Sequence, residues 1–190
     1  MRNVYEFLIP ALWTAWIVYW FIAARGAKAV RRRETVGSRL THGVPLVVAI
    51  LLLAPSHLAN QALAARFLPR TVTGFWIGAI LVACGLSFSV LARLYLGGNW
   101  SGTVTLKRDH TLIQAGPYRF ARHPIYTGLL VAIVGSAITE GEMRAILALA
   151  LIVWAFLWKI RAEEQFMLEQ FGDAYARYRQ RVAALIPGVI

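Results

Sequence analysis

Long apolar stretches separated by polar connections dominate the pattern of this chain. Five of them are candidates for membrane-crossing helices: Phe7–Ala24, Leu40–Leu63, Gly74–Leu96, Pro124–Ile138 and Ala145–Trp158. A bilayer core about 30 Å thick needs about 20 apolar residues per helix, and the first three stretches reach that length. The last two, of roughly 15 residues each, can cross if the helix continues beyond its apolar part or if basic ends reach the headgroups. The pattern predicts an all-α integral membrane protein with about five transmembrane helices.

The polar residues after the fifth apolar stretch keep a helical period. We expect that helix to run past Trp158 and to end near Phe171-Gly172, because glycine is a good helix terminator. Residues Asp173–Ala184 predict a short amphipathic helix in a C-terminal cytoplasmic segment. Between the third and fourth stretches, Val104–Leu106 and Leu112-Ile113 predict either a short hairpin or an ordered loop.

Charge placement gives the chain a direction in the membrane. The chain is 58% hydrophobic and carries a net charge of +11, which by itself would also suit nucleic-acid binding. Sixteen of the 20 Lys and Arg residues, however, lie near or after the ends of the first, third and fifth stretches. The other side keeps Arg2, Arg66, Arg70 and Arg144. This positive-inside pattern predicts an N-terminus outside and a C-terminus in the cytoplasm. The first stretch lacks a basic leader and a cleavage site, so we expect a retained helix rather than a signal peptide.

Titratable and aromatic side chains gather in Pro117–Gly128, at the start of the fourth apolar stretch. The fourth and fifth helices are joined by a turn of about six residues and should be antiparallel neighbours. His123 and Tyr126 would then lie beside Arg161 and Glu163. Carboxylates can hold ribose hydroxyls or an ammonium group, cations can hold a carboxylate or phosphate, and tyrosine rings can stack on a base. The sequence predicts a site for a bifunctional ligand. The alternative is that these residues only flank the spans, with the glutamates paired to arginines.

Several motifs between Asp109 and Pro187 occur together, in order. They are Asp109–Ile113, Gly116–Arg119, Arg122–Gly128, Glu163-Glu164, Phe171-Gly172, Tyr175 with Tyr178, and Leu185–Pro187. As a set they resemble the isoprenylcysteine carboxyl methyltransferase family. The resemblance implies a membrane enzyme that uses S-adenosylmethionine in a cytoplasmic pocket built by the last two spans and the following helix. We divide the single membrane domain, 1–190, into scaffold spans at 1–98 and a cofactor-binding part at 99–190.

The resemblance also assigns residues by position. It implies cofactor contacts at His110, Thr111, Leu112, Ile113, Tyr118, His123, Pro124, Ile125, Tyr126 and Glu163. In the family an arginine just before the acidic pair holds the acceptor's carboxylate. Here Lys159 stands at that position, with Arg161 two residues on, and lysine lacks the two-pronged geometry of arginine. We take Arg122, Lys159, Arg161 and Glu164 as candidate catalytic residues, with Arg122 orienting the pocket or acceptor and Glu164 taking a proton from an amine acceptor.

Other activities share the C-terminal pattern. Lipid amine N-methyltransferases, including phospholipid methyltransferases, and NADPH-dependent sterol-type reductases are alternatives, and a non-catalytic membrane protein is a third. The reductases are usually longer, so methyl transfer to a lipophilic acceptor, foremost a carboxylate, is favoured. The expected partners are a lipophilic small molecule or prenylated substrate and membrane lipids. No metal is expected, because the four histidines lack metal-binding spacing and Cys84 stands alone. The compact, Ala- and Arg-rich chain indicates a bacterial inner membrane.

Overall fold

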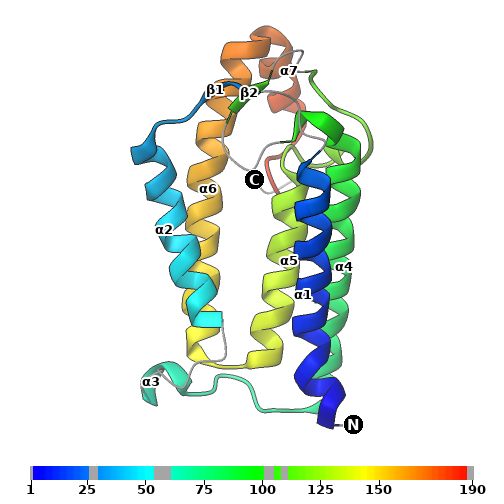
Figure 1. Ribbon diagram of the computed structural model, residues 1–190, viewed down its shortest axis with the longest axis vertical. Helices are drawn as coiled ribbons and strands as arrows, with labels where there is room; N and C mark the ends of the chain where they lie inside the picture. The colour runs from blue at the N-terminus through cyan, green and yellow to red at the C-terminus, as the bar shows by residue number, and fades with distance from the viewer. Residues whose placement is uncertain (1, 26–29, 54–60, 101–104, 108–110, 188–190) are drawn as a thin grey trace.

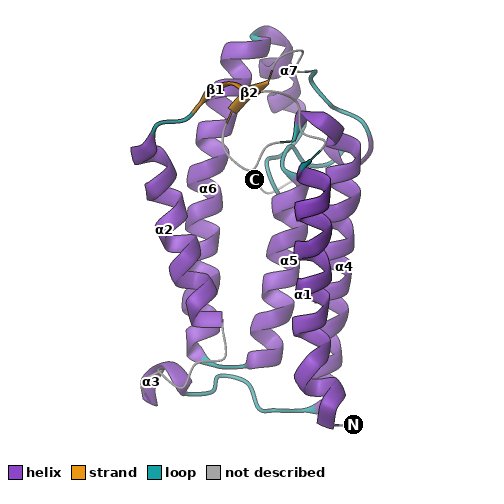
Figure 2. Cartoon of the chain, viewed as in Figure 1, coloured by secondary structure: helices purple, strands orange, loops and turns teal. Residues whose placement is uncertain are grey.

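The computed structural model describes residues 2–25, 30–53, 61–100, 105–107 and 111–187. Five long helices stand roughly upright beside one another and make up most of the molecule (Figure 1, Figure 2). They are α1 (Arg2–Ala24), α2 (Val36–Leu53), α4 (Val72–Leu96), α5 (Pro124–Glu140) and α6 (Met143–Phe171). The shorter elements are α3 (Gln61–Ala64), α7 (Asp173–Arg181), the 3₁₀ turns η1 (Gly97–Asn99) and η2 (Gly116–Arg119), and the strands β1 (Val30–Arg33) and β2 (Thr105–Lys107).

The predicted all-α membrane fold is confirmed. In the described part of the chain, α1, α2, α4 and α6 are long and apolar enough to cross a membrane, and α5 is a shorter apolar helix. As expected, α6 continues well beyond its apolar part and ends at Phe171, before Gly172. The long helix carries the glutamate pair of the predicted site to the end of the bundle where α5 begins.

The structure corrects the second span and the turn after the fourth. Helix α2 begins at Val36 and ends at Leu53, whereas the sequence predicted Leu40–Leu63. Thr35 accepts a backbone hydrogen bond from Ser38 (3.3 Å) and starts the helix early. The α5–α6 turn is two residues rather than six, because Gly141 adopts the left-handed conformation that closes a helix tightly.

Helices α4 and α5 pack backbone to backbone through facing glycines. A Cβ added to Gly85 would lie 2.4 Å from the carbonyl oxygen of Gly128, and one added to Gly135 would lie 2.5 Å from that of Gly78. This close approach fits the small-residue interfaces of membrane helices. This pair of helices forms the rigid wall from which the site is built.

Helix α1 is attached to this wall by two tryptophans. Trp13 Nε1 donates to Ser136 Oγ of α5 (3.1 Å), and Trp16 Nε1 donates to Ser89 Oγ of α4 (2.7 Å). Both serines are buried, and Ser89 has no exposed surface. Buried polar groups need partners, so the two hydrogen bonds fix how α1 is rotated.

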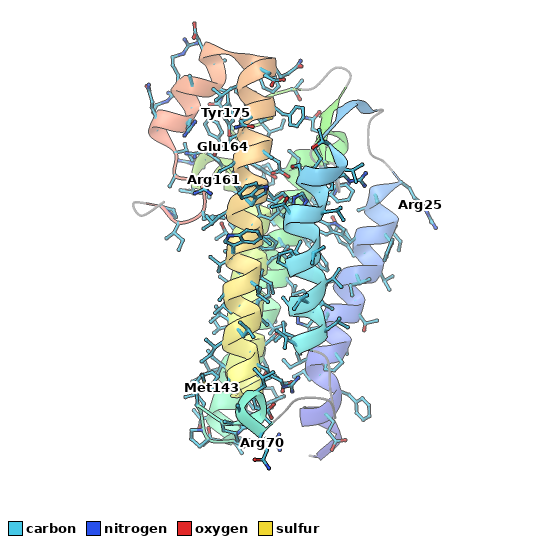
Figure 3. The ribbon with its side chains drawn as sticks, turned by 90° about the vertical axis from the view of Figure 1, so that its left-hand side faces the viewer. Arg25, Arg70, Met143, Arg161, Glu164 and Tyr175 are labelled. Carbon is cyan, nitrogen blue, oxygen red and sulfur yellow. The ribbon has the colours of Figure 1, made fainter. Side chains whose placement is uncertain are left out.

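Charged side chains gather at the two ends of the bundle. Figure 3 shows Arg161, Glu164 and Tyr175 toward one end, and Arg70 and Met143 at the other. The second end holds the α5–α6 turn, which a buried arginine ties down. Arg144 contacts Glu140 (2.8 Å) and Glu142 (2.6 Å) and donates to the backbone carbonyl of Leu52 in α2 (2.8 Å).

A small two-stranded sheet joins two connections at the Glu164 end. Strand β2 pairs antiparallel with β1, which lies between α1 and α2. The sequence had considered a hairpin with Leu112-Ile113, but residues 111–115 form no strand, so that alternative is wrong for the described residues. The pairing joins the connection between α1 and α2 to the connection between α4 and η2.

Candidate functional site

A cavity of about 260 Å³ opens at the end of the bundle where α5 begins. Its walls come from α1, the connection between α4 and η2, the start of α5, the polar part of α6, and α7. Ten of the 14 predicted site residues line it. They are Thr111, Leu112, Ile113, Tyr118, Arg122, His123, Ile125, Tyr126, Lys159 and Glu163.

The other four predicted residues lie elsewhere. Pro124 is fully buried in the first turn of α5, behind the cavity wall. Glu164 is buried and contacts cavity residues without lining the cavity itself. Arg161 is exposed and does not line it. His110 falls outside the described residues.

His123 lies between the two consecutive glutamates of α6. Its Nδ1 is 3.4 Å from Glu163 Oε2, and its Nε2 is 3.3 Å from Glu164 Oε1. Burial alone lowers the pKa of His123, but the hydrogen bonds to both carboxylates outweigh it and raise that pKa above its usual value. The imidazolium form is therefore favoured, and it holds α5 against α6. The expected adjacency of the two polar runs is confirmed.

Tyr126 completes this contact one turn further along α5. Its hydroxyl donates to Glu163 Oε1 at 2.6 Å, and its ring stacks on Phe156 with centroids 4.8 Å apart. Lys159, one turn before Glu163, places its ammonium 5.6 Å from the centre of the Tyr126 ring. The cavity thus presents an oriented carboxylate, an ammonium group and an aromatic face together.

Arg122 binds protein groups on two sides. Its guanidinium contacts Glu164 Oε1 through Nε (2.8 Å) and Nη2 (2.7 Å), the forked pairing that favours arginine over lysine. Nη1 donates to the backbone carbonyls of Arg179 (3.1 Å) and Val182. Arg122 therefore anchors the segment after α7 to the α5–α6 junction, as a residue that orients the pocket.

Backbone contacts fix the rest of that C-terminal segment. The amides of Arg122 and His123 donate to the carbonyls of Ala183 and Ala184, both at 2.9 Å. Thr127 Oγ1 donates to the carbonyl of Leu185 (2.8 Å). The segment therefore lies along the start of α5 and brings α7 over the cavity.

Two tyrosines of α7 cover the polar end of the cavity. Tyr175 and Tyr178 are buried and line it, and the Tyr178 hydroxyl donates to the backbone carbonyl of Tyr118 (2.5 Å). Burial raises the pKa of Tyr178 to about 12, so the hydroxyl stays protonated and remains a donor. The sequence placed both tyrosines in the predicted C-terminal helix but did not indicate what they cover.

An aromatic wall from α1 and η1 was missed as part of the site. Trp16 and Trp20 stack with ring centroids 4.4 Å apart, and Trp100 meets Trp20 edge-on at 5.5 Å. All three line the cavity, although none of them was among the residues predicted for the site. The spacing of Trp13, Trp16 and Trp20 on one helical face was the available signal.

Asn99 fixes the loop that carries the first predicted cofactor contacts. It is buried, and its side-chain amide donates to Thr111 Oγ1 at 2.8 Å. The η1 turn, which ends at Asn99, therefore sets where Thr111–Ile113 meet the cavity. A buried asparagine after paired glycines gave no sign of this partner, 12 residues away.

The described residues hold no group of three or more His, Cys, Asp or Glu side chains placed to bind a metal ion. The cavity is apolar at its inner end and carries a carboxylate, an imidazole and an ammonium group nearer the polar end. Such a surface suits a ligand with both polar and apolar parts. The fold and site together define an integral membrane protein with a ligand pocket at one end of its helices.

Residues 73–174 match the sequence model of the phospholipid methyltransferase family. The match spans just over half of the chain, so the chain belongs to this family. The matched range contains most of the residues that line the cavity and leaves out α1.

Individual relatives confirm the resemblance to isoprenylcysteine carboxyl methyltransferases. The chain is 34% identical over 99 residues to protein-S-isoprenylcysteine O-methyltransferase of Schizosaccharomyces pombe, covering 50% of this chain and 42% of that relative. It is 28% identical over 162 residues to protein-S-isoprenylcysteine O-methyltransferase B of Arabidopsis thaliana, covering 78% and 82%. Thus the chain spans less than half of the first relative and most of the second.

A solved structure shares the fold. It is that of a eukaryotic intramembrane Ras methyltransferase, an isoprenylcysteine carboxyl methyltransferase, with a TM-score of 0.50 and 24% identity. The likeness covers 79% of this chain and 63% of that one. It supports the integral membrane architecture.

Proposed function

We propose that the protein is a membrane-embedded methyltransferase that moves a methyl group from S-adenosylmethionine to the carboxylate of a lipophilic, S-prenylcysteine-like acceptor. One observation carries the proposal: His123 and Tyr126 of α5 meet Lys159 and Glu163 of α6 at a single cavity. The named activities of the relatives support the reaction type.

The cavity residues fit the proposed methyl donor. Glu163 offers a carboxylate that suits ribose hydroxyls or an ammonium group, and Tyr118 and Tyr126 offer aromatic faces to a positive charge or a base. The loop residues Thr111–Ile113 add backbone groups, a hydroxyl and two branched apolar side chains. S-adenosylmethionine, when bound, supplies an electrophilic methyl group. The protein holds the donor through these groups and keeps Glu163 oriented through Tyr126.

The same residues favour a carboxylate acceptor over an amine. A carboxylic acid, with a pKa near about 4, is already ionised at neutral pH and needs no general base. An amine must lose a proton, and Glu164 or His123 would have to take it. Glu164 is held by Arg122 (2.7 Å), and His123 lies between two carboxylates that favour its protonated form. Lys159 provides the positive charge that a carboxylate needs, while the enclosing helices exclude water.

We infer further that the cavity end of the bundle faces the cytoplasm of a bacterial inner membrane. Most lysine and arginine residues lie in the connections at that end, as the positive-inside rule requires. Reporter fusions at the two ends would test the orientation: a reporter active only in the cytoplasm should work after α7 and fail before α1.

A product assay tests the reaction. Purified protein in detergent is supplied with S-adenosylmethionine carrying a labelled methyl group, together with N-acetyl-S-farnesylcysteine or phosphatidylethanolamine. The proposal expects label in the cysteine derivative, released as methanol by mild base because the product is an ester. Base-stable label in the phospholipid would identify an amine methyltransferase and overturn the carboxylate assignment. Binding of NADPH in place of S-adenosylmethionine would overturn methyl transfer altogether.

A further inference from the structure

The inner end of the cavity is made by one residue from each of three helices. Along α1, α5 and α6, the lining residues nearest the bundle centre are Trp16, Leu129 and Phe156. The charged lining residues, among them Lys159 and Glu163, all lie closer to the polar end. The cavity therefore has an apolar floor below a charged rim.

The Trp16 side chain is fixed in this floor by a hydrogen bond and a stacking contact as well as by packing. Its indole N–H donates to Ser89 Oγ at 2.7 Å, and Ser89 in turn donates to the carbonyl of Leu86 (2.8 Å). Its ring stacks on Trp20 with centroids 4.4 Å apart. Since Ser89 is fully buried, rotating the indole away would leave a buried hydroxyl without one of its partners. The ring thus has one favoured position against the cavity.

The space between the charged rim and the floor is short. Lys159 and Phe156 are three residues apart on α6, which is about 4.5 Å of helix rise. A hydrocarbon chain attached near an acid group at Lys159 meets the floor after a few atoms. How it continues depends on the bulk of the floor residues.

Helix α1 supplies the part of the floor that the family match does not cover. The match spans 73–174, which includes Leu129 and Phe156 but not Trp16. The rim and two floor residues thus lie inside the matched range, while the third floor residue belongs to a helix outside it.

We propose that Trp16 is a specificity-determining residue that limits how far the hydrocarbon group of the methyl acceptor enters the cavity. This inference rests on the proposed function, since it concerns the acceptor of that reaction. The indole face and the side chains of Leu129 and Phe156 favour an unsaturated, branched chain, and the size of the indole penalises a longer one. In hydrophobic pockets one methylene changes selectivity by about 10- to 200-fold, so removal of an indole is large on this scale.

The test measures acceptor selectivity in the full-length protein in detergent. N-acetyl cysteines carrying two, three and four isoprene units are compared for wild type, Trp16→Ala and Trp16→Phe, by kcat/KM and by equilibrium binding of each acid. We expect the ratio of the longest to the shortest acceptor to rise about tenfold or more in Trp16→Ala. Trp16→Phe, which keeps a smaller ring, should fall between wild type and Trp16→Ala.

Trp13→Ala is the matched control. Trp13 is an indole of the same helix, bonded to a buried serine in the same way, but it does not line the cavity. It should lower thermal stability and leave the selectivity ratio unchanged. If Trp16→Ala leaves the ratio unchanged, or if Trp13→Ala shifts it equally, the inference is overturned.

Binding of S-adenosylmethionine is measured in every variant, so that failure of the Trp16 role can be told apart from failure of the proposed methyl transfer. Retained cofactor binding with an unchanged ratio refutes only the role of Trp16. A wild-type protein that methylates none of the three acids refutes the proposed function, and the inference falls with it.

Discussion

Tyr126 of α5 and Glu163 of α6 share a hydrogen bond of 2.6 Å at the rim of the cavity. The contact joins the family's two polar runs, and it leaves the second oxygen of Glu163 to His123 (3.4 Å). Replacing Tyr126 by Phe keeps the ring stacked on Phe156 and removes only the hydroxyl. A hydrogen bond to a charged group contributes about 1.5–3 kcal/mol, so we expect S-adenosylmethionine to bind roughly 10- to 100-fold more weakly. Calorimetric titration checks this; unchanged affinity would show that Glu163 needs no orientation by Tyr126.

Lys159 and Arg161 are the two candidates for binding the carboxylate of the acceptor, and variants of each distinguish them. Lys159→Met should raise KM for a prenylcysteine acid by about 10-fold or more, because a charged hydrogen bond is lost, with little change in cofactor affinity. Arg161→Met should change neither quantity, since Arg161 is exposed outside the cavity. Lys159→Arg should retain activity, as arginine also pairs with carboxylates. Steady-state kinetics of the three variants show which residue binds the acceptor. Loss of activity in Arg161→Met alone would assign that role to Arg161 instead of Lys159.

Arg122 should control the docking of α7. Arg122→Lys keeps one positive charge but loses the fork on Glu164 and the contacts to the Arg179 and Val182 carbonyls. The segment after Phe171 should become more accessible to trypsin, seen as faster cleavage in limited proteolysis. Arg177→Lys changes an exposed residue of α7; it is the control and should be digested at the same rate as wild type. Equal rates of digestion for Arg122→Lys and wild type would show that backbone contacts alone hold the segment after Phe171 in place.

The raised pKa of His123 makes part of the stability depend on pH. The folded protein binds the imidazole proton more tightly than the unfolded chain, whose histidine pKa is about 6.5. The stabilising contribution is therefore complete below about pH 6.5 and is lost as pH rises through the higher pKa of the folded state. His123→Gln should lower the melting temperature most at low pH, with the difference shrinking toward alkaline pH. The titratable groups facing His123 are Glu163, Glu164 and Tyr126, whose ring stacks on the imidazole. A difference independent of pH would mean that folding does not change the pKa of His123.

The glycine contact between α4 and α5 should be intolerant of side chains. In Gly85→Ala the new Cβ would lie 2.4 Å from the carbonyl oxygen of Gly128, which is backbone and moves only with the helix. Overpacking of this kind costs about 1–3 kcal/mol, so the melting temperature in detergent should fall. Gly43→Ala, in α2 with no atom within 4 Å of the new Cβ, is the control and should be neutral or slightly stabilising.

The sequence predicted what depends on local patterns. Apolar stretches predicted the five helices, and the short connection predicted between α5 and α6 placed His123 beside Glu163, as the structure confirms. Contacts between distant segments left weaker signals. Trp16 reaches Ser89 across 73 residues, and hydrophobic periodicity does not choose among partners for an indole. The docking of Ala183 and Ala184 runs through backbone atoms, which leave no trace in residue type. Helix ends shifted where a single residue, such as Thr35, outweighed hydropathy.

Direct binding of S-adenosylmethionine to wild type, Glu163→Gln and Glu169→Gln tests the central claim most directly. Glu163 lines the cavity, whereas Glu169 is an exposed carboxylate on the same helix, so the pair separates a site effect from a general change of charge. We predict saturable binding by wild type and Glu169→Gln, and a loss of about 100-fold or more in Glu163→Gln, since a charged partner inside a cavity is removed. Equal affinity in all three proteins, or no binding by wild type, would contradict the account.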